Sequence, residues 1–550
     1  MESKIAYISS EFALGDDLPI YAGGLGVLAG DILLEARRSN LPLIGISVFY
    51  REGFFKQLID PSGKQQHFYD SVDPAAAGLA DTGKTIEIPL LDHDLYLKIW
   101  KKETSKGGRH AHEPLFLLDG DIPENRPEDR KITDRLYERV WAPHLIDDLV
   151  LGIGSARAVR ALKLPIKVWH INDDHGTLNI MERIREYMAS GLTLEEAREK
   201  VKSETVFTTH TPVAGAESKF EKEEFTKVLT SLFSGLNVDL EEIWRLGERD
   251  WEGKKLFSLT VFSMRHARAV NAVSRKHFEI SKELWKFIGE EVPTAYVTNG
   301  VYSPHWTPTE LEDLWEKDPG AEEIKKAKLQ AKTRASKEIG KIALDGKTFD
   351  PKALTLTWCR RFARYKQPNL LLTDLDRIIN ILTDSKRPVY LLVSGKAHPE
   401  DPEGQKFVKN IIEASRNPHL KNRLVYIPNY DLDVAHLLLT AADVWLNTPV
   451  VGWEASGTSG MKAIFNAALN ASTPDGWWLE GFNGENGWVI EPQNEDYATP
   501  TYDLIEKEIA PTYYDNPEKW FGMVKEAYKT CGGKFDTKRV MEEYGALYGP

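Results

Sequence analysis

The sequence predicts an α/β protein built from two doubly wound domains. Short apolar runs typical of buried parallel strands recur along the 550 residues, followed by polar or glycine-rich loops and then helical patterns. This alternation occurs over 1–298 and again over 351–516, and a chain of this length exceeds one hydrophobic core. We therefore expect two Rossmann-like domains facing a cleft. The charged helical segment 299–350 would join them, and a helical tail, 517–550, would pack back on the first domain.

The composition excludes several classes of partner. The net charge is −13, which argues against nucleic acid or an anionic membrane surface as the main partner and leaves neutral substrates and locally bound anions. Only two cysteines occur, no apolar run approaches membrane-spanning length, and no leader precedes the first predicted strand. We therefore expect a reduced, cytoplasmic protein.

The first domain opens with a strand, a glycine-rich loop and a helix. The strand covers 4–11, the loop contains Gly23, Gly24 and Leu25, and the helix follows from 27. This βαβ opening is only a weak indicator of a dinucleotide site, because the acidic partner of a ribose is not evident.

Polar residues follow two later strands of this domain. Asp173 and His175 come after the strand 167–172, and His210 comes after the strand 204–209. Open α/β sheets place their ligands at such strand ends. The alternatives are that Asp173 caps a helix and that the histidines are structural.

Two further segments of this domain carry predictions. Residues 257–274 have helical periodicity. The sequence His-Ala-His-Glu at 110–113 has metal-ligand residue types, but without a second ligand cluster we predict no metal site.

The second domain begins with a strand that is followed by a cluster of cations. The strand covers 353–358, and Arg360, Arg361, Arg364 and Lys366 follow within seven residues. Such runs are usually solvated surface. The strand-end position favours another interpretation, because arginine forks and a lysine are suited to binding inorganic phosphate.

The segment 454–462, EASGTSGMK, lies between a buried strand and a predicted helix. Backbone N–H groups of its small residues would point at a phosphate at the helix start. Lys462 would then be a phosphate contact or a Schiff-base partner. A capped helix with a solvated lysine is the alternative. The candidate contacts are Glu454, Ala455, Ser456, Gly457, Thr458, Ser459 and Lys462.

This segment resembles the pyridoxal-phosphate segment of the α-glucan (glycogen, starch and maltodextrin) phosphorylases. The family pattern continues in order from Ile5 to about Ile490. The resemblance implies a glycosyltransferase B fold and reversible phosphorolysis of α-1,4-glucan by inorganic phosphate to glucose 1-phosphate, with retention of configuration. It also implies that Lys462 carries pyridoxal 5′-phosphate, and it leaves a homo-oligomer open.

The resemblance implies a role for each candidate residue. The catalytic set is Arg361, Lys366, His210 and Glu454. The cofactor contacts are Lys462, Arg360, Tyr430, Gly457, Thr458, Ser459, Trp306 and Gly24. The substrate contacts are Gly23, Gly24, Leu25, Asp173, His175, His210, Asn299, Ala455, Ser456 and Gly457.

Two other functions fit parts of the sequence. A nucleotide-sugar glucosyltransferase of the glycogen-synthase type shares the fold and the cation clamp, but it has no need for Lys462. A glucan-binding protein without catalysis would suit the 15 tryptophans and 20 tyrosines, but the clamp and the lysine argue against it.

The chain also departs from the family pattern. The animal enzymes have an N-terminal extension that carries a phosphorylation switch and part of an effector site, whereas the first strand begins here at residue 5. We therefore expect hyperbolic kinetics without an AMP response. Ala13 replaces a tyrosine of the animal enzymes, which leaves cofactor contacts on that side in doubt.

Overall fold

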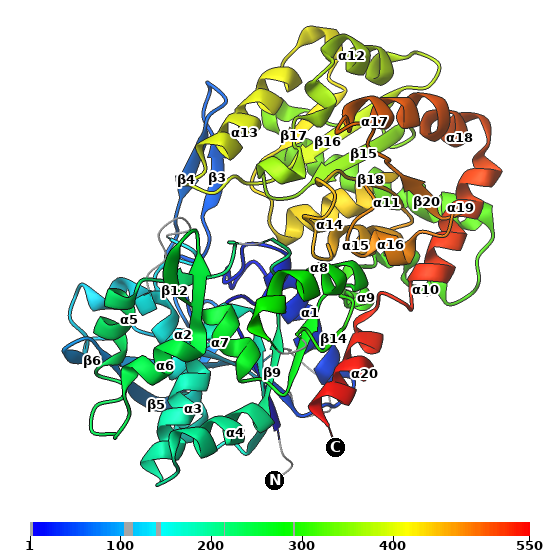
Figure 1. The fold of residues 1–550 in the computed structure, drawn as a ribbon. Helices are drawn as coiled ribbons and strands as arrows, with labels where there is room; N and C mark the ends of the chain where they lie inside the picture. The colour runs from blue at the N-terminus through cyan, green and yellow to red at the C-terminus, as the bar shows by residue number, and fades with distance from the viewer. Residues whose placement is uncertain (1–3, 104–113, 139–144, 214, 290–291, 550) are drawn as a thin grey trace. The chain divides into compact units, whose positions relative to one another are not determined.

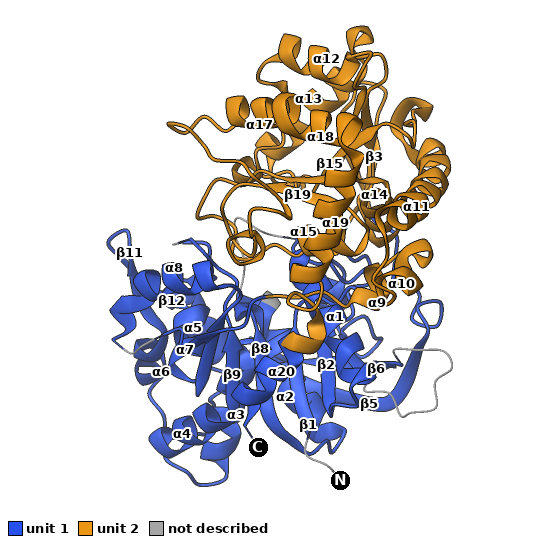
Figure 2. Ribbon diagram, turned by 90° about the vertical axis from the view of Figure 1, so that its right-hand side faces the viewer, with its two compact units in different colours: residues 1–54, 69–298, 540–550 blue, residues 55–68, 299–539 orange. Residues whose placement is uncertain are grey.

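The computed structural model describes residues 4–103, 114–138, 145–213, 215–289 and 292–549, and these form two compact units (Figures 1 and 2). Unit 1 comprises 1–54, 69–298 and 540–550, and unit 2 comprises 55–68 and 299–539. Both are mixed α/β structures with parallel sheets.

Within the described residues, the main sheet of unit 1 has nine strands in the order β14–β13–β9–β8–β1–β2–β7–β6–β5. The strands from β14 to β7 are parallel, and β6 and β5 continue the sheet antiparallel. The chain runs outward from β1 in both directions, so the order reverses between β1 and β8, where doubly wound sheets place their ligands. The strands are β1 (Lys4–Ser9), β2 (Leu43–Val48), β5 (Leu79–Leu90), β6 (His93–Lys102), β7 (Leu115–Asp119), β8 (Ile166–Asn172), β9 (Thr205–Thr208), β13 (Ala269–Ala272) and β14 (Ala295–Tyr296).

Helices and one small sheet complete unit 1. The small sheet has the order β10–β12–β11. Its strands are β10 (Lys219–Phe220), β11 (Glu248–Trp251) and β12 (Lys254–Ser258). The helices are α1 (Gly24–Arg38), η1 (Asp129–Thr133), α2 (Leu145–Ala161), η2 (Asp174–Gly176), α3 (Leu178–Ala189), α4 (Leu194–Glu204), α5 (Lys222–Leu229), α6 (Leu240–Gly247), α7 (Leu259–Arg265), α8 (Arg275–Trp285) and η3 (Lys286–Ile288).

The sheet of unit 1 is buried on both faces. Ala6 and Ile8 of β1 belong to one core cluster, whereas Tyr7 between them belongs to a second. Tyr544 and Tyr548, near the end of α20 (Thr537–Tyr548), join the second cluster. The apolar character of β1 therefore follows from packing on two sides.

The main sheet of unit 2 is entirely parallel, in the order β17–β16–β15–β18–β19–β20. Its order reverses between β15 and β18. The strands are β15 (Leu354–Cys359), β16 (Val389–Ser394), β17 (Leu424–Ile427), β18 (Val444–Asn447), β19 (Leu469–Ser472) and β20 (Gly487–Val489), and a separate hairpin is formed by β3 (Lys56–Ile59) and β4 (Gln65–Phe68).

The helices of unit 2 surround this sheet. They are α9 (Ser303–Trp306), α10 (Thr309–Trp315), α11 (Ala321–Ile342), η4 (Leu344–Gly346), η5 (Arg364–Lys366), η6 (Leu370–Leu372), α12 (Leu375–Thr383), α13 (Pro402–Ser415), η7 (Pro418–Leu420), α14 (Leu432–Ala441), α15 (Ser459–Phe465), α16 (Trp478–Gly481), α17 (Ala498–Leu504), the π-helix η8 (Ile505–Ile509), α18 (Ala510–Asp515) and α19 (Pro517–Cys531). The boundary between the two units at 539/540 falls within α20.

The structure differs from the sequence-based expectations in two segments. Residues 257–274 are the end of β12, the short helix α7 and strand β13, because apolar residues buried on all sides give no period that separates a helix from a strand. Residues 299–350, expected to connect two domains, belong to unit 2, where α11 buries Ile324 and Ala331.

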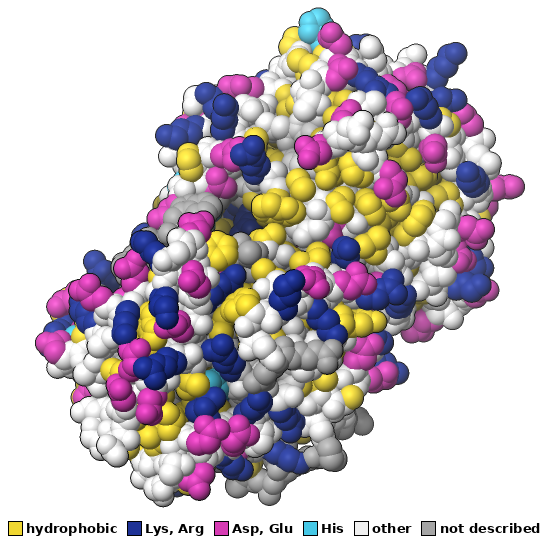
Figure 3. Space-filling model, viewed as in Figure 1, with side chains coloured by type: hydrophobic (Ala, Val, Ile, Leu, Met, Phe, Trp, Pro, Cys, Tyr) yellow, Lys and Arg dark blue, Asp and Glu magenta, His cyan; other side chains and the backbone are white. Residues whose placement is uncertain are grey.

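The surface and helices give two further observations. On the face shown in Figure 3, acidic and basic side chains are interspersed. Among the described residues, no helix has the length and apolar character needed to cross a bilayer.

Helix α1 packs tightly against the segment that follows β1. The Ala13 N–H donates to the Gly26 carbonyl at 2.9 Å. A Cβ on Gly30 would lie 2.1 Å from the Ala13 carbonyl oxygen, whereas a Cβ on Gly24 would meet no atom within 4 Å. Gly30 therefore sets how closely the helix approaches, and Gly24 does not.

This contrast predicts the stability of two alanine variants. Gly30→Ala should lower the free energy of unfolding by about 1–3 kcal/mol, because the new methyl group overlaps a backbone carbonyl. Gly24→Ala should leave it unchanged or raise it by up to ~1 kcal/mol, because alanine is the better helix former. Urea unfolding of both variants measures this, and equal stabilities would contradict the described approach of α1.

Candidate functional site

The first candidate site residue of unit 2 is a buried arginine at the end of β15. Arg360 is 8% exposed, and its terminal nitrogen Nη2 donates to the Leu446 carbonyl at 2.5 Å. Its Nε makes no hydrogen bond within the described part of the chain. Burial lowers the pKa of Arg360, so the fold holds this cation at a cost in desolvation. A buried guanidinium with an unused donor is a feature that an anionic ligand would satisfy.

The other cations of the cluster have different surroundings. Lys366 is buried and hydrogen-bonds to the carboxylate of Glu454, itself largely buried. Arg361 is exposed and hydrogen-bonds to Tyr365. Burial alone would raise the pKa of Tyr365, but Lys366 and Arg361 lower it below its ordinary value. The side chain of Arg364 is 84% exposed, so the run divides into two exposed arginines, Arg361 and Arg364, and two buried cations, Arg360 and Lys366, that lie near Glu454.

The loop that carries Glu454 is held by a buried aspartate. One oxygen of Asp475 accepts the N–H groups of Gly452, Trp453 and Glu454 at 2.8, 3.1 and 2.9 Å. Its other oxygen accepts the N–H of Gly476 at 2.9 Å. Burial raises the pKa of Asp475 to about 6, against the lowering effect of these hydrogen bonds. Asp475 therefore fixes the backbone from which Glu454 reaches Lys366.

The segment after Glu454 presents open backbone donors. Gly457 has φ of +84°, a conformation that suits glycine, and Thr458 precedes the short helix α15. The N–H groups of Gly457, Thr458 and Ser459 make no hydrogen bond within the described chain. The hydroxyl of Ser456 is buried and also unpaired there, whereas Ser459 Oγ accepts the indole N–H of Trp445 at 3.1 Å. Three consecutive free donors at a turn form a concavity suited to an anion.

The amine of Lys462 lies beside an aromatic wall. Its Nζ is 3.8 Å from the centre of the Trp306 ring. Trp306 stacks on His436 with ring centroids 4.6 Å apart, and His436 Nε2 is 3.3 Å from His305 Nε2. Burial, with His305 and Lys462 close by, lowers the pKa of His436 to about 3, so this ring is neutral at neutral pH. A buried lysine next to stacked flat rings is not the solvated residue of the alternative interpretation.

Tyr430 and Asn299 complete the predicted set in unit 2. Burial, together with Cys359, raises the pKa of Tyr430, while the nearby Arg360 lowers it, so Tyr430 keeps its proton. Asn299 is buried, and its carbonyl accepts Nη2 of Arg539 at 3.1 Å. Ala455 lies in the same loop as Glu454.

In unit 1, Glu11 holds the glycine-rich loop. One oxygen accepts the N–H groups of Ala22 and Gly23 at 2.7 and 3.0 Å, and the other accepts the Tyr137 hydroxyl at 2.7 Å. The N–H of Gly23 is therefore used internally. Those of Gly24 and Leu25, in the first turn of α1, have no acceptor in the described residues, and Cβ atoms at 23 and 24 would meet open space.

The ends of β8 and β9 bring together the polar residues predicted there. Asp173 has φ of +70°, and burial together with Asp174 raises its pKa to about 7. His175 Nδ1 donates to Asp148 at 3.0 Å. Burial lowers the pKa of His175, but this hydrogen bond and nearby carboxylates raise it to about 10.

His210 has the opposite protonation state. Burial, with His277 nearby, lowers the pKa of His210 to about 3, and its Nε2 donates to Asn172 Oδ1 at 2.8 Å. Asn172 in turn donates to Ser9 Oγ at 3.2 Å. Unit 1 therefore presents a cationic histidine, a neutral histidine and an aspartate whose pKa is raised by burial.

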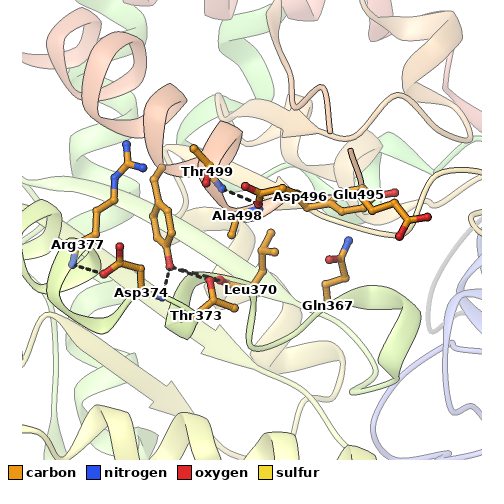
Figure 4. Close-up of a pocket in the computed structure, with 11 residues that line it drawn as sticks. Gln367, Leu370, Thr373, Asp374, Arg377, Glu495, Asp496, Ala498 and Thr499 are labelled. Carbon is orange, nitrogen blue, oxygen red and sulfur yellow. Dashed lines mark hydrogen bonds between the residues drawn. The ribbon is translucent and has the colours of Figure 1, made fainter. Parts of the chain in front are cut away.

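A separate pocket of about 380 Å³ in unit 2 is lined by none of the predicted residues (Figure 4). It lies between the turn after Lys366 and the segment 495–502. Asp374 accepts the N–H of Arg377, and Asp496 accepts those of Ala498 and Thr499. These carboxylates therefore cap local turns.

No metal site is found among the described residues. They include no group of three or more histidine, cysteine or acidic side chains that could hold an ion. The candidate segment 110–113 lies outside the described residues.

Sequence reasoning missed the residues that orient the candidates. Glu11, Asn172, Asp148 and Asp475 hold the glycine loop, His210, His175 and the Glu454 loop, respectively. Strand-end position was an available signal for Glu11 and Asn172. Asp148 lies within a helix and Asp475 in a turn, so nothing local distinguishes them.

Parallel sheets with buried cations after a strand end, one of them with an unused donor, define an α/β protein with a candidate anion site. Comparison with known proteins identifies the family. Residues 255–483 match the family model described as carbohydrate phosphorylase. The chain is 37% identical to the maltodextrin phosphorylase of Thermococcus litoralis, covering 99% of this chain and 70% of the relative. It is 33% identical to the glycogen phosphorylase of Aquifex aeolicus (99% and 85%) and 35% identical to that of Mycobacterium tuberculosis (100% and 71%). The chain belongs to the carbohydrate phosphorylase family.

The role of Asp475 generates a prediction about local stability. In Asp475→Asn the charged acceptor of three N–H groups is lost, and charge-assisted hydrogen bonds contribute about 1.5–3 kcal/mol. Amide hydrogen exchange at 452–454 should therefore accelerate by about 10–100-fold, with little change in global stability. Asp496→Asn, which alters an exposed turn cap, is the matched control. Unchanged protection at 452–454 would show that the loop is held by other contacts.

Proposed function

We propose that the protein is an α-glucan phosphorylase, a hexosyltransferase that catalyses reversible phosphorolysis of glycogen, starch or maltodextrin to glucose 1-phosphate with retention. The observation that carries the proposal is the buried Arg360 with an unused donor, close to Glu454 of the Lys366–Glu454 pair. The open N–H groups of 457–459, a few residues after Glu454, add to it. The names of the relatives, maltodextrin and glycogen phosphorylase, support it. We place its site of action in the cytoplasm.

The proposed architecture is the glycosyltransferase B fold, in which two Rossmann-like domains face a cleft. Both main sheets have the reversed strand order of doubly wound folds, and the candidate residues follow strands next to each reversal. Glu11 and Asp173 follow β1 and β8 in unit 1, and Arg360 follows β15 in unit 2. Glucan would be bound mainly by unit 1 and phosphate by unit 2.

The residues of unit 2 fit pyridoxal 5′-phosphate. Lys462 would hold the cofactor covalently, with Trp306 beside it and Tyr430 and Gly24 as further contacts. Arg360 and the N–H groups of Gly457, Thr458 and Ser459 would bind its phosphate. When bound, the cofactor supplies a second phosphate group with a pKa near ~6, which is a proton source close to the substrate phosphate.

The chain's own residues would then perform phosphorolysis by binding and charge stabilisation. Arg361 and Lys366 hold inorganic phosphate, which gives its proton to the departing glycosidic oxygen. A phosphate oxygen forms the new bond to the anomeric carbon as the bond to that glycosidic oxygen breaks. The transition state is oxocarbenium-like, so the dianion held by these cations stabilises it. Glu454 keeps Lys366 in place and orients a sugar hydroxyl.

The glucosyl unit would be positioned by polar groups of unit 1 and by two short segments of unit 2. Neutral His210 donates through Nε2 to Asn172, which leaves Nδ1 to accept a hydrogen bond from a sugar hydroxyl, and Asp173 and His175 bind further hydroxyl groups. Gly23 leaves room for the sugar, and the N–H groups of Gly24 and Leu25 bind its oxygens. Asn299, Ala455, Ser456 and Gly457 are the further contacts proposed.

The proposal predicts the attachment point of the cofactor. Because Lys462 is the buried amine beside Trp306, borohydride reduction followed by peptide mass mapping should find the pyridoxyl adduct on Lys462. The buried Lys366, which pairs with Glu454, is the internal comparison and should be unmodified. An active protein with unmodified Lys462 would exclude the phosphorylase proposal.

The proposal also ranks the cations of the cluster. Arg361→Ala and Lys366→Ala should each lower kcat by at least ~10²-fold, because each removes a charge that stabilises the transition state. Arg364→Ala should change it little, since its side chain is solvated. Steady-state phosphorolysis of maltoheptaose measures all three, and equal losses would mean that the phosphate site is misassigned.

A further inference from the structure

The hairpin 55–68 belongs to unit 2 although the chain before and after it belongs to unit 1 (Figure 2). One face of the hairpin carries two buried glutamines, Gln57 and Gln65, while Leu58 and Phe68 on the other face are about half exposed. Buried amides are rarely left unpaired, because the cost of desolvation is high. The partners of these glutamines therefore indicate what the hairpin holds.

Gln57 uses both groups of its side-chain amide and its backbone N–H. Its Nε2 donates to Gln65 Oε1 at 2.7 Å and to the Gly395 carbonyl at 2.9 Å. Its Oε1 accepts the Asn429 N–H at 2.9 Å and lies 3.1 Å from the Tyr426 hydroxyl, which also reaches the Gly395 carbonyl. Its backbone N–H donates to Asn429 Oδ1 at 3.0 Å. Gln57 therefore links the loop after β16 to the loop after β17.

Gln65 also hydrogen-bonds through both groups of its side-chain amide, but to other partners. Its Oε1 accepts the Ala397 N–H, and its Nε2 donates to the Ala397 carbonyl and to His67 Nε2. Burial lowers the pKa of His67, which keeps Nε2 able to accept this hydrogen bond. Lys396 Nζ also donates to the Phe55 carbonyl at 2.9 Å. Gln65 thus holds only the loop after β16.

The two positions held by Gln57 adjoin proposed cofactor-binding residues. Asn429 has φ of +57° and immediately precedes Tyr430. Gly395 lies against Arg360, since a Cβ there would be 2.0 Å from the Arg360 carbonyl oxygen. Arg360 and Tyr430 are close enough that each influences the pKa of the other. A change at Gln57 is therefore transmitted to the backbone that carries both.

We propose that Gln57 is a positioning residue of the phosphate side of the active site. By joining Gly395 to Asn429, it sets the separation of Arg360 and Tyr430, and so the geometry in which the cofactor phosphate and inorganic phosphate are held. This inference rests on the proposed phosphorylase function. The segment 55–68, which lies within the first 70 residues of the chain, would thus contribute to the phosphate site of unit 2.

Two variants test the proposal in the full-length holoenzyme. Gln57→Met keeps the length of the side chain and removes its hydrogen bonds. Asn429→Gly keeps a residue that adopts positive φ and removes only the side-chain contacts to the hairpin and to Asp431. Both should raise KM for inorganic phosphate by about tenfold and speed loss of pyridoxal phosphate on gel filtration by about tenfold, because misplaced binding groups lose most of their effect. KM for maltoheptaose should change by less than about twofold.

The matched control is Gln66→Met. Gln66 is an exposed residue of the adjacent strand β4, and its side-chain amide donates to Asp60. It should leave both KM values and cofactor retention unchanged. If Gln57→Met and Asn429→Gly behave like this control, or if both KM values rise together, Gln57 has no positioning role. If the protein without substitutions does not release glucose 1-phosphate from maltoheptaose and phosphate, the proposed function is wrong, and this inference falls with it.

Discussion

The structure of unit 2 depends on holding cations out of water at the carboxyl edge of a parallel sheet. A buried guanidinium or ammonium is costly unless an anion or a ring of dipoles compensates it. Each of the three buried cations is compensated differently. Lys366 has the carboxylate of Glu454, and Lys462 has the π face of Trp306. Arg360 has one carbonyl as hydrogen-bond acceptor, the Trp358 ring at 5.3 Å and an unused Nε. The unused donor of Arg360 is the feature from which we propose that this edge binds an anion.

In both units, a buried side-chain acceptor binds backbone N–H groups of a loop. This explains why the loops keep a defined conformation without regular secondary structure. A buried acceptor collects backbone N–H groups from a loop: Glu11 collects those of Ala22 and Gly23, and Asp475 collects three N–H groups before and at Glu454. Gln57 does so with an uncharged amide. Loops held in this way leave their remaining N–H groups, such as those of Gly24 and 457–459, free for a ligand. Preorganised donors of this kind need no rearrangement when charge develops.

Local patterns were sufficient to predict the α/β class and the polar residues that follow the strands, because strand burial and loop polarity are encoded in neighbouring residues. The helical character predicted for 299–350 was also correct for its longest part, α11 (Ala321–Ile342). The prediction of one helix over 257–274 was wrong, because residues buried on all sides show no periodic alternation of apolar and polar side chains. The contacts of Gln57 and Asp148 could not be predicted, because their partners lie far along the chain and neither side chain belongs to a recognisable motif.

Contacts between segments that are distant in the sequence also affect how the chain folds. Unit 2 lacks the partners of Gly395 and Asn429 until residues 55–68 dock on it, and unit 1 lacks part of its core until Tyr544 and Tyr548 pack against His170. The chain therefore passes between the units at 54/55, 68/69, 298/299 and 539/540. Contacts between distant segments offset the entropy of loop closure only when they form, so each unit is complete only after a segment far along the sequence has docked on it. The backbone around Arg360 and Tyr430 therefore depends on contacts from residues 55–68 as well as on its own unit's later segments.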